Sequence, residues 1–283
     1  MTHPHDPHDP HDPHPVRFGA KLVPQGTSIA ALRGFWRLAD ESGFDHLWVY
    51  DHLAGVGNAA TVAEPDPAID LYDGWTLLAA MASETRHARL GCMVTANTLR
   101  HPAVLAKIAT TVDHLSGGRL EFGIGTGWAE YEHRMLALEL GGARQRIEKL
   151  AEALAVIKAL WSSERFTDFA GEHYTLEKAV HAPKPLQRPH PPIWLGGTGE
   201  KRMLRLVAEH ADVWNMPGGD IYSGSCALDQ SLIWRPRPGL PGHRTHVGQL
   251  WHVGASTHPG PGLGAGSGTL VAKQLLKRRL RRR

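Results

Sequence analysis

The chain has 283 residues, of which 42% are hydrophobic, and a formal net charge of +3. This length accommodates one large domain, and α/β barrels are within its range. Two cysteines far apart in sequence, Cys92 and Cys226, exclude a disulfide framework or a zinc site. No apolar run approaches the roughly 18 residues of a membrane span, and no signal peptide is recognisable. We therefore expect a cytoplasmic protein without a metal or a membrane partner.

The charge is distributed unevenly along the chain. Residues 1–229 contain 21 Lys and Arg against 28 Asp and Glu, whereas residues 230–283 contain ten Lys and Arg and no acidic residue. The second part is also rich in Gly and Pro and ends in a basic run at 277–283. We interpret 230–283 as an atypical tail with a solvated basic end, so we expect no nucleic-acid partner for the folded body.

The first 15 residues carry a His-Asp-Pro repeat. A proline at every third position prevents regular structure, and the repeat offers no apolar side chains to bury. Its five histidines could bind a transition metal weakly, but we expect a disordered leader at 1–15. The folded domain is predicted to span 16–229.

From residue 16 onward, strand-like and helix-like segments alternate. The predicted strands are the short apolar runs at 17–23, 46–51, 89–96, 119–125, 192–196 and 212–216. The predicted helices have apolar residues at helical spacing and lie at 28–42, 73–84, 102–115, 129–138, 144–161 and 199–209. Gly43 ends the first helix, and Pro102 suits the first turn of the third. The segment 165–192 has two proline clusters and is predicted to be irregular or hairpin-like.

This alternation predicts a parallel sheet with right-handed crossovers. Six such units in about 200 residues fit most of a (β/α)8 barrel, but they also fit an open doubly wound sheet. Periodicity alone leaves both architectures open. In either of them the active site lies at the carboxyl ends of the strands, so candidate residues are sought there.

Four predicted strands end in chemically distinctive residues. Asp51 and His52 close the second strand, and residues 93–98 close the third. The glycine-rich segments 123–128 and 196–199 close the fourth and fifth. The last segment leads directly into a helix, whose free N–H groups and positive dipole end favour a phosphate site. An ordinary tight turn is the alternative interpretation.

The glycine loop at 123–127 is less specific. It lacks the G-x-G-x-x-G spacing of a dinucleotide-binding fingerprint. With residues 120–122 before it, the loop resembles that of S-adenosylmethionine-dependent methyltransferases, although their loop follows the first strand and this one follows the fourth. A methyltransferase is therefore an alternative function.

Asp51 and His52 fit an acid/base pair, because histidine titrates near neutrality and a carboxylate can orient it. Adjacent residues on a strand point to opposite faces, however, so structural polar contacts are the alternative. We interpret His114 and His133, both on predicted helices, as structural residues and not as ligands.

Taken in order, the segments 99–107, 115–128, 192–199 and 211–215 resemble the luciferase-like flavin and deazaflavin oxidoreductases, in particular the coenzyme F420-dependent subgroup. The resemblance runs from about residue 16 to residue 219 and is specific in order, spacing and motif. It implies an α/β fold, a TIM barrel of the bacterial-luciferase type, in which 165–192 is an insertion before the fifth strand. The implied function is F420-dependent hydride transfer to or from a small organic substrate. An FMN-dependent monooxygenase is the alternative within this fold.

The resemblance also implies where a cofactor would bind. Its ring would rest against a bulge in the third strand, where related proteins have a non-proline cis peptide, and its phosphate would lie at the fifth strand end. The implied cofactor-binding residues are Met93, Val94, Thr95, Asn97, Gly125, Gly127, Trp128, Gly196, Gly197, Thr198 and Gly199. His52 matches a position near the hydride-transferring carbon in sugar-phosphate dehydrogenase relatives. We therefore expect His52, with Asp51, to be catalytic and to relay a proton or polarise the substrate.

Two departures from the family limit these expectations. Where sugar-phosphate dehydrogenases carry a carboxylate, this chain has Trp128, so we expect an apolar substrate with a reducible double bond or carbonyl instead of a sugar phosphate. After Gly219 the family pattern is lost, which suggests a reading-frame change near 219–230 and a barrel that is incomplete at its C-terminal end. Open strand edges would favour aggregation, so a non-catalytic barrel remnant is a further alternative. The assembly expected is a homodimer.

Overall fold

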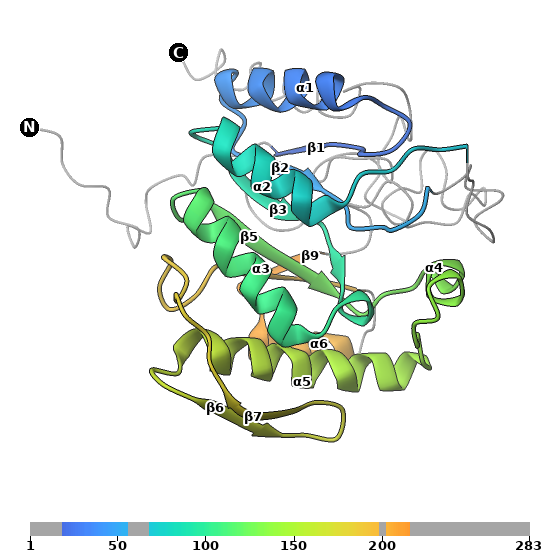
Figure 1. The fold of residues 1–283 in the computed structure, drawn as a ribbon, viewed down its shortest axis with the longest axis vertical. Helices are drawn as coiled ribbons and strands as arrows, with labels where there is room; N and C mark the ends of the chain where they lie inside the picture. Colours follow the sequence, from blue (N-terminus) through green and yellow to red (C-terminus); the bar gives the residue numbers. More distant parts are fainter. Residues whose placement is uncertain (1–18, 56–67, 198–201, 216–283) are drawn as a thin grey trace, which may run out of the picture. The chain divides into compact units, whose positions relative to one another are not determined.

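The main sheet has parallel strands whose order in space follows their order in the chain. The computed structural model describes residues 19–55, 68–197 and 202–215. Within this part the strand order is β1-β2-β3-β5-β8-β9, and a short strand, β4, pairs with β5 (Figure 1). The bounds are β1 Gly19–Lys21, β2 His46–Val49, β3 Arg89–Cys92, β4 Thr95–Ala96, β5 Leu120–Gly125, β8 Ile193–Gly196 and β9 Val213–Asn215.

The strand order decides between the two predicted architectures. In an open doubly wound sheet the order reverses at a switch point, whereas around a barrel it advances in one direction. The described strands advance without a reversal. The predicted luciferase-type barrel is therefore confirmed for this part of the chain. The leader at 1–15, the tail at 230–283 and the suggested frame change near 219–230 lie outside the described residues.

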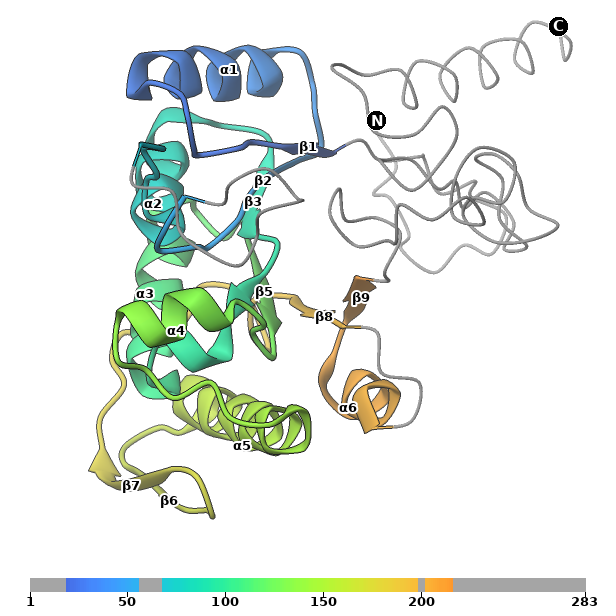
Figure 2. The same ribbon diagram turned by 90° about the vertical axis from the view of Figure 1, so that its right-hand side faces the viewer.

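The helices begin where capping residues predict them. Ser28 Oγ accepts a hydrogen bond from the backbone N–H of Ala31 at 3.2 Å, Asp73 Oδ1 accepts one from Thr76 at 2.7 Å, and Pro102 opens its helix. The helices are α1 Ile29–Glu41, α2 Gly74–Glu84, α3 Pro102–Leu115, α4 Glu130–Met135, α5 Ala143–Ser162 and α6 Arg202–His210, with a 3-10 turn η1 at Asn97–Leu99. Figure 2 shows α1, α2 and α3 along one side of the sheet.

Side chains alternate between the two faces of the strands. On the face toward the helices, Phe122 of β5 is fully buried. Its ring centroid lies 6.1 Å from that of Trp75 on α2 and 5.2 Å from that of Trp161 on α5. These rings form the centre of the hydrophobic core, so the strands are fixed against the helical layer.

The opposite face, which is the barrel interior, is polar at its amino-terminal end. Glu121 of β5 is buried and accepts hydrogen bonds from Arg89 and from the indole of Trp194. Farther along the strands this face carries Gly123, Gly125 and Gly196, which have no side chains. Near the carboxyl ends of β5 and β8 this face therefore carries no side chains of its own.

Two elements differ from the predicted pattern, and a third segment takes one of its two predicted forms. The third strand, predicted as 89–96, is interrupted between β3 and β4. The helix predicted at 129–138 stops at Met135, because Ala137 has a positive φ of 54° that ends the helix. The segment 165–192 contains an antiparallel hairpin, β6 Thr167–Ala170 and β7 Thr175–Ala179, as one of its two predicted forms. Among the described helices, none combines the length and the apolar character that a membrane span requires.

Candidate active site

The carboxyl ends of four neighbouring strands bring most of the predicted site residues to one edge of the sheet. Asp51 and His52 follow β2, residues 93–94 link β3 to β4, which begins at Thr95, and the loop 126–128 follows β5. Gly196 and Gly197 end β8, whereas Thr198 and Gly199 of the predicted phosphate loop lie outside the described residues. The structure therefore describes the residues predicted to contact the cofactor ring, but only the first two residues of the predicted phosphate loop.

The interruption of the third strand is a bulge at Met93 and Val94, and the peptide bond between them is cis, as the resemblance implies. Glycines on the next strands make room for the bulge. A Cβ on Gly123 would lie 1.9 Å from the carbonyl oxygen of Cys92, and one on Gly125 would lie 2.9 Å from the Val94 side chain. The glycines of this motif therefore serve the close approach of β5 to the bulge.

The loop after β5 is fixed by a buried histidine. Gly127 has a φ of +76°, and a Cβ there would lie 2.4 Å from Thr98 Oγ1. His133 Nδ1 donates to the carbonyl of Ala129 at 2.7 Å, so its Nε2 accepts from the Thr98 hydroxyl at 2.7 Å. His133 is thus a buried structural residue, as predicted, and His114 likewise bonds the Lys184 carbonyl at 2.8 Å.

His52 is oriented by Glu132, a residue that the sequence did not single out. Nδ1 of His52 lies 3.0 Å from Oε2 and 3.1 Å from Oε1 of Glu132. The carboxylate also accepts from the backbone N–H of Leu53 at 2.6 Å and of Ala54 at 3.3 Å. Because a carboxylate can only accept, Nδ1 carries the proton and Nε2 is the nitrogen left for chemistry.

Glu132 is ionised despite being only 1% exposed. Burial alone would raise the pKa of Glu132, but the hydrogen bonds from His52 and from the Leu53 and Ala54 amides outweigh it and lower the pKa. The short helix α4 therefore supplies a fixed negative charge beside the imidazole.

Aromatic rings flank His52. The ring of Tyr50 lies 5.5 Å from His52 and that of Trp128 lies 5.5 Å away at an angle of 78°. Trp128 is 54% exposed, although it is a large apolar residue. The histidine is therefore held between a buried aromatic ring and one that faces outward at the strand end.

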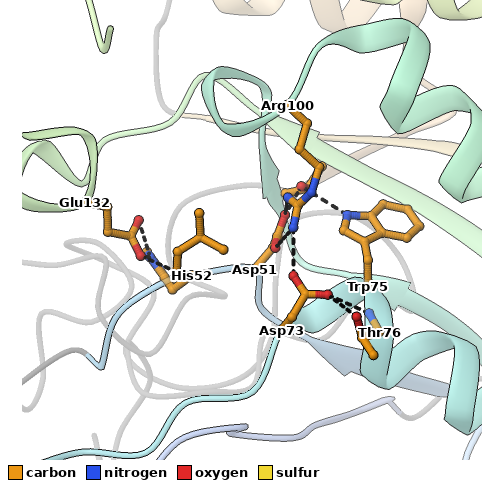
Figure 3. A network of polar contacts seen from close by, with 9 residues as sticks. Asp51, His52, Asp73, Trp75, Thr76, Arg100 and Glu132 are labelled. Atoms are coloured by element: carbon orange, nitrogen blue, oxygen red, sulfur yellow. Dashed lines mark hydrogen bonds and ion pairs between the residues drawn. The ribbon is translucent and has the colours of Figure 1, made fainter. Parts of the chain in front are cut away.

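Asp51 does not pair with His52, which corrects the predicted acid/base pair. The Asp51 side chain is fully buried, and it pairs with Arg100 (Figure 3). Its Oδ2 lies 2.5 Å from Arg100 Nη1, and its Oδ1 lies 3.0 Å from Arg100 Nη2. The carboxylate also accepts a hydrogen bond from the Thr95 hydroxyl. Burial raises the pKa of the Asp51 carboxyl, and the Arg100 guanidinium opposes that shift. The physical reason for the correction is strand alternation, because Asp51 points to the helical side and His52 does not.

Asn97 is directed toward the insertion. Its Nδ2 donates to the hydroxyl of Tyr174 at 3.2 Å, and the side chain is buried. Tyr174 lies at the turn of the β6–β7 hairpin, which Glu152 of α5 fixes by accepting the backbone N–H of His173 at 2.9 Å. The predicted contact of Asn97 with a cofactor ring therefore stays a proposal.

Sequence reasoning missed Glu132 and Arg100 for identifiable reasons. Glu132 lies in the first turn of the helix that follows the glycine loop, and the prediction of that helix did not include the direction of its side chains. Arg100 belongs to the 99–107 motif, which served only for the resemblance. Among the described residues, no group of His, Cys, Asp or Glu has the arrangement of a metal site.

Known proteins are similar to this chain in sequence. The luciferase-like monooxygenase family matches residues 14–224. The chain is similar to the F420-dependent glucose-6-phosphate dehydrogenase of Microbacterium testaceum, with 32% identity over 253 residues that cover 87% of this chain and 69% of that protein. It is also similar to the oxygenase component of the flavin-dependent trigonelline monooxygenase of Acinetobacter baylyi, with 34% identity over 161 residues that cover 56% of this chain and 40% of the relative.

Among solved structures, an F420-dependent secondary alcohol dehydrogenase in complex with an F420–acetone adduct superposes with a TM-score of 0.62 at 23% identity, which supports the fold alone. The match covers 71% of this chain and 57% of that one, so the chain spans little more than half of this structure. The family match ends at residue 224. The match to the Microbacterium protein covers 87% of this chain, which is more than the share that residues 1–229 make up, so this match extends into the basic tail.

Proposed function

This chain belongs to the luciferase-like monooxygenase family, and on that basis we propose that it is an oxidoreductase that uses coenzyme F420 for hydride transfer to or from a small organic substrate. The observation that carries the proposal is the His52–Glu132 pair beside the bulge at Met93 and Val94, at the carboxyl ends of parallel strands. The Microbacterium glucose-6-phosphate dehydrogenase, which matches 87% of this chain against 56% for the trigonelline monooxygenase, is F420-dependent.

The residues at the strand ends fit a planar tricyclic ring. Gly123, Gly125 and Gly196 leave the interior face of β5 and β8 without side chains, and Val94 covers part of it with apolar carbons. A flat ring can lie against such a surface, where any larger residue would displace it. We assign the ring to Met93, Val94 and Thr95 with Gly125, Gly127 and Trp128, and the phosphate to Gly196–Gly199.

A bound deazaflavin supplies the two-electron hydride chemistry. The protein supplies the proton transfer that must accompany it. We assign this role to Nε2 of His52, because Glu132 holds the proton of the other ring nitrogen. Within the described part of the chain, the hydrogen bonds of the His52 ring involve Nδ1 and not Nε2, so we assign Nε2 to a substrate oxygen.

The substrate that suits this site is an apolar alcohol or carbonyl compound. The ring centroid of Trp128 lies 5.5 Å from that of His52, and Met135 and Leu136 stand at the end of the helix α4 that carries Glu132. They are 47% and 42% exposed, and Trp128 is 54% exposed. We propose that Trp128, together with Met135 and Leu136, forms an apolar lip of the site, and burying these side chains against a substrate would be favourable.

The alternatives differ in support. An FMN-dependent monooxygenase is the second candidate, because the similarity to the trigonelline monooxygenase points to a flavin. Family membership and the barrel order of the strands leave no support for a methyltransferase. The homodimer stays a prediction.

An anaerobic assay with reduced F420 and a series of aliphatic ketones tests the proposal. The proposal requires oxidation of F420 that depends on both the ketone and the protein, and it requires a His52→Gln variant to lose this activity. Consumption of oxygen with reduced FMN, without any reaction of reduced F420, would favour the monooxygenase instead.

A further inference from the structure

We propose that Arg100 is a positioning residue that holds the strand end carrying His52 against the bulge that would receive the cofactor ring. The inference rests on the proposed function in one respect, namely that the bulge is the ring site. Figure 3 shows the network around Arg100.

Arg100 binds the residue after the end of β2, Asp51, through two parallel hydrogen bonds. Its Nη1 and Nη2 lie 2.5 Å and 3.0 Å from the two carboxylate oxygens of Asp51. The Asp51 side chain is fully buried and that of Arg100 is 16% exposed, so solvent does not compete with the pair. Asp51 directly precedes His52, and fixing its side chain therefore fixes the backbone from which the imidazole extends.

The same carboxylate reaches the bulge. Thr95, the first residue of β4 after the cis peptide, donates its hydroxyl to Asp51 Oδ2. The indole of Trp75 donates to that hydroxyl at 3.2 Å. Thr95 is fully buried, so these bonds fix the position of β4 relative to β2.

Arg100 also anchors α2. Its Nη2 lies 2.8 Å from Asp73 Oδ2, while Asp73 Oδ1 caps the helix by accepting from Thr76. One guanidinium therefore faces two carboxylates from two different elements. Loss of the guanidinium would leave the buried Asp51 carboxylate without its partner, and a lysine would keep the charge but lack the planar fork.

The test compares Arg100→Lys with Arg119→Lys. Arg119 is a matched control because it lies at the opposite ends of the strands, where it donates to Thr85 Oγ1 at 3.0 Å and to the carbonyl of Ala88 at 2.6 Å. Three properties are measured for both variants: the affinity for F420 by fluorescence titration, the NMR signal of the His52 ring in the cofactor-free protein, and the thermal unfolding temperature. The His52 signal is assigned with a His52→Gln variant.

We expect the Arg100→Lys variant to bind F420 about tenfold more weakly, because the loss of one charge-assisted hydrogen bond corresponds to about this factor. We also expect the NMR signal of His52 to shift. Arg119→Lys is expected to lower the unfolding temperature while leaving both the affinity and the His52 signal unchanged. If Arg100→Lys does not fold, Thr95→Val keeps the ion pair and removes the hydroxyl that joins Asp51 and the Trp75 indole to the bulge. Because Thr95 is itself assigned to the ring site, only the His52 signal is compared for this variant, and we expect that signal to shift.

The inference is overturned if the folded Arg100→Lys variant leaves both the affinity and the His52 signal unchanged, or if Thr95→Val in its place leaves the His52 signal unchanged. It is also overturned if Arg119→Lys changes them equally, because the effect would then be one of stability alone. Failure of the wild-type protein to bind F420, with a His52 shift that is specific to Arg100→Lys, would refute the cofactor assignment and leave the link between the strands intact.

Discussion

Nδ1 of His52 lies 3.0 Å from Oε2 of Glu132, and this contact joins the end of β2 to the short helix α4. Glu132 is buried, and backbone amides of Leu53 and Ala54 hold its other oxygen. The carboxylate therefore cannot turn away from the ring without breaking two further hydrogen bonds. The orientation and the tautomer of the imidazole are fixed before any substrate arrives.

Glu132→Gln is expected to lower turnover about 100-fold, the range of a lost general acid–base contribution. The Leu53 amide requires an acceptor, so the glutamine oxygen would stay there and its NH2 group would face His52 Nδ1. This reverses the tautomer and places the proton on Nε2. The measurement is the turnover number at saturating F420. Glu130→Gln, an exposed neighbour on the same helix, serves as the control, and equal turnover in both variants would contradict the role of Glu132.

Gly123→Ala is expected to destabilise the protein by about 1–3 kcal/mol or more, because its Cβ would lie 1.9 Å from the Cys92 carbonyl oxygen and the strands would have to separate. Gly34→Ala lies in α1 with nothing within 4 Å of its Cβ, and it is expected to stabilise by about 1 kcal/mol. Urea unfolding of the two variants measures both effects. Equal changes in stability would show that β5 does not need a glycine beside the bulge.

Trp128→Glu is expected to weaken the binding of apolar substrates, because it replaces an exposed apolar ring beside His52 with a charge. In the wild-type protein, each added methylene of a ketone series should lower KM about fourfold until the lip is covered, which corresponds to about 0.8 kcal/mol per group. Phe166→Ser is the control, since Phe166 is also 54% exposed but precedes the hairpin strand β6. A KM that is independent of chain length would argue against an apolar lip.

Local signals in the sequence predicted most of the fold. Ser28, Asp73 and Pro102 begin helices in the structure as their chemistry requires. The order of the strands, in contrast, depends on contacts between distant segments, and the family resemblance was needed to choose the barrel. The structure brings most of the predicted site residues to one edge of the sheet because they were sought at strand ends, which lie together in either architecture.

The partners within the site could not be predicted from local patterns. Glu132 lies 80 residues from His52, and Arg100 lies 49 residues from Asp51. The dipeptide of Asp51 and His52 suggested a pair because the two residues are adjacent, but alternation on the strand sends their side chains in opposite directions. Only the packing of α4 and η1 against the sheet identifies the true partners.

His181 is expected to make the protein less stable in mild acid. Burial and the nearby Lys107 and Lys184 ammonium groups lower its pKa from 6.5 to about 4. Its Nε2 donates to Thr110 Oγ1 at 2.9 Å, because the Thr110 hydroxyl donates its own proton to the carbonyl of Ala106. The folded state therefore favours the neutral ring.

The contribution of His181 to stability is fully present above the unfolded pKa and is lost as the pH falls from 6.5 to about 4. In this window the unfolded state binds more protons, so stability falls by about 1.4 kcal/mol per pH unit. Urea unfolding at several pH values measures the slope, and His181→Gln is expected to remove this part of it. The control His87→Gln, at an exposed histidine, should keep the wild-type slope of stability against pH. If His181→Gln also kept that slope, the assignment of the slope to His181 would be refuted.

The central claim is that the strand ends around His52 and the bulge at Met93 and Val94 bind F420. A fluorescence titration of the purified full-length chain with F420, repeated with FMN, tests it most directly. We predict saturable binding that is tighter for F420 than for FMN, and an affinity that His52→Gln changes by no more than about twofold, because His52 is assigned to proton transfer and not to holding the cofactor. Tighter binding of FMN, or no binding of either cofactor by the folded protein, would contradict the account.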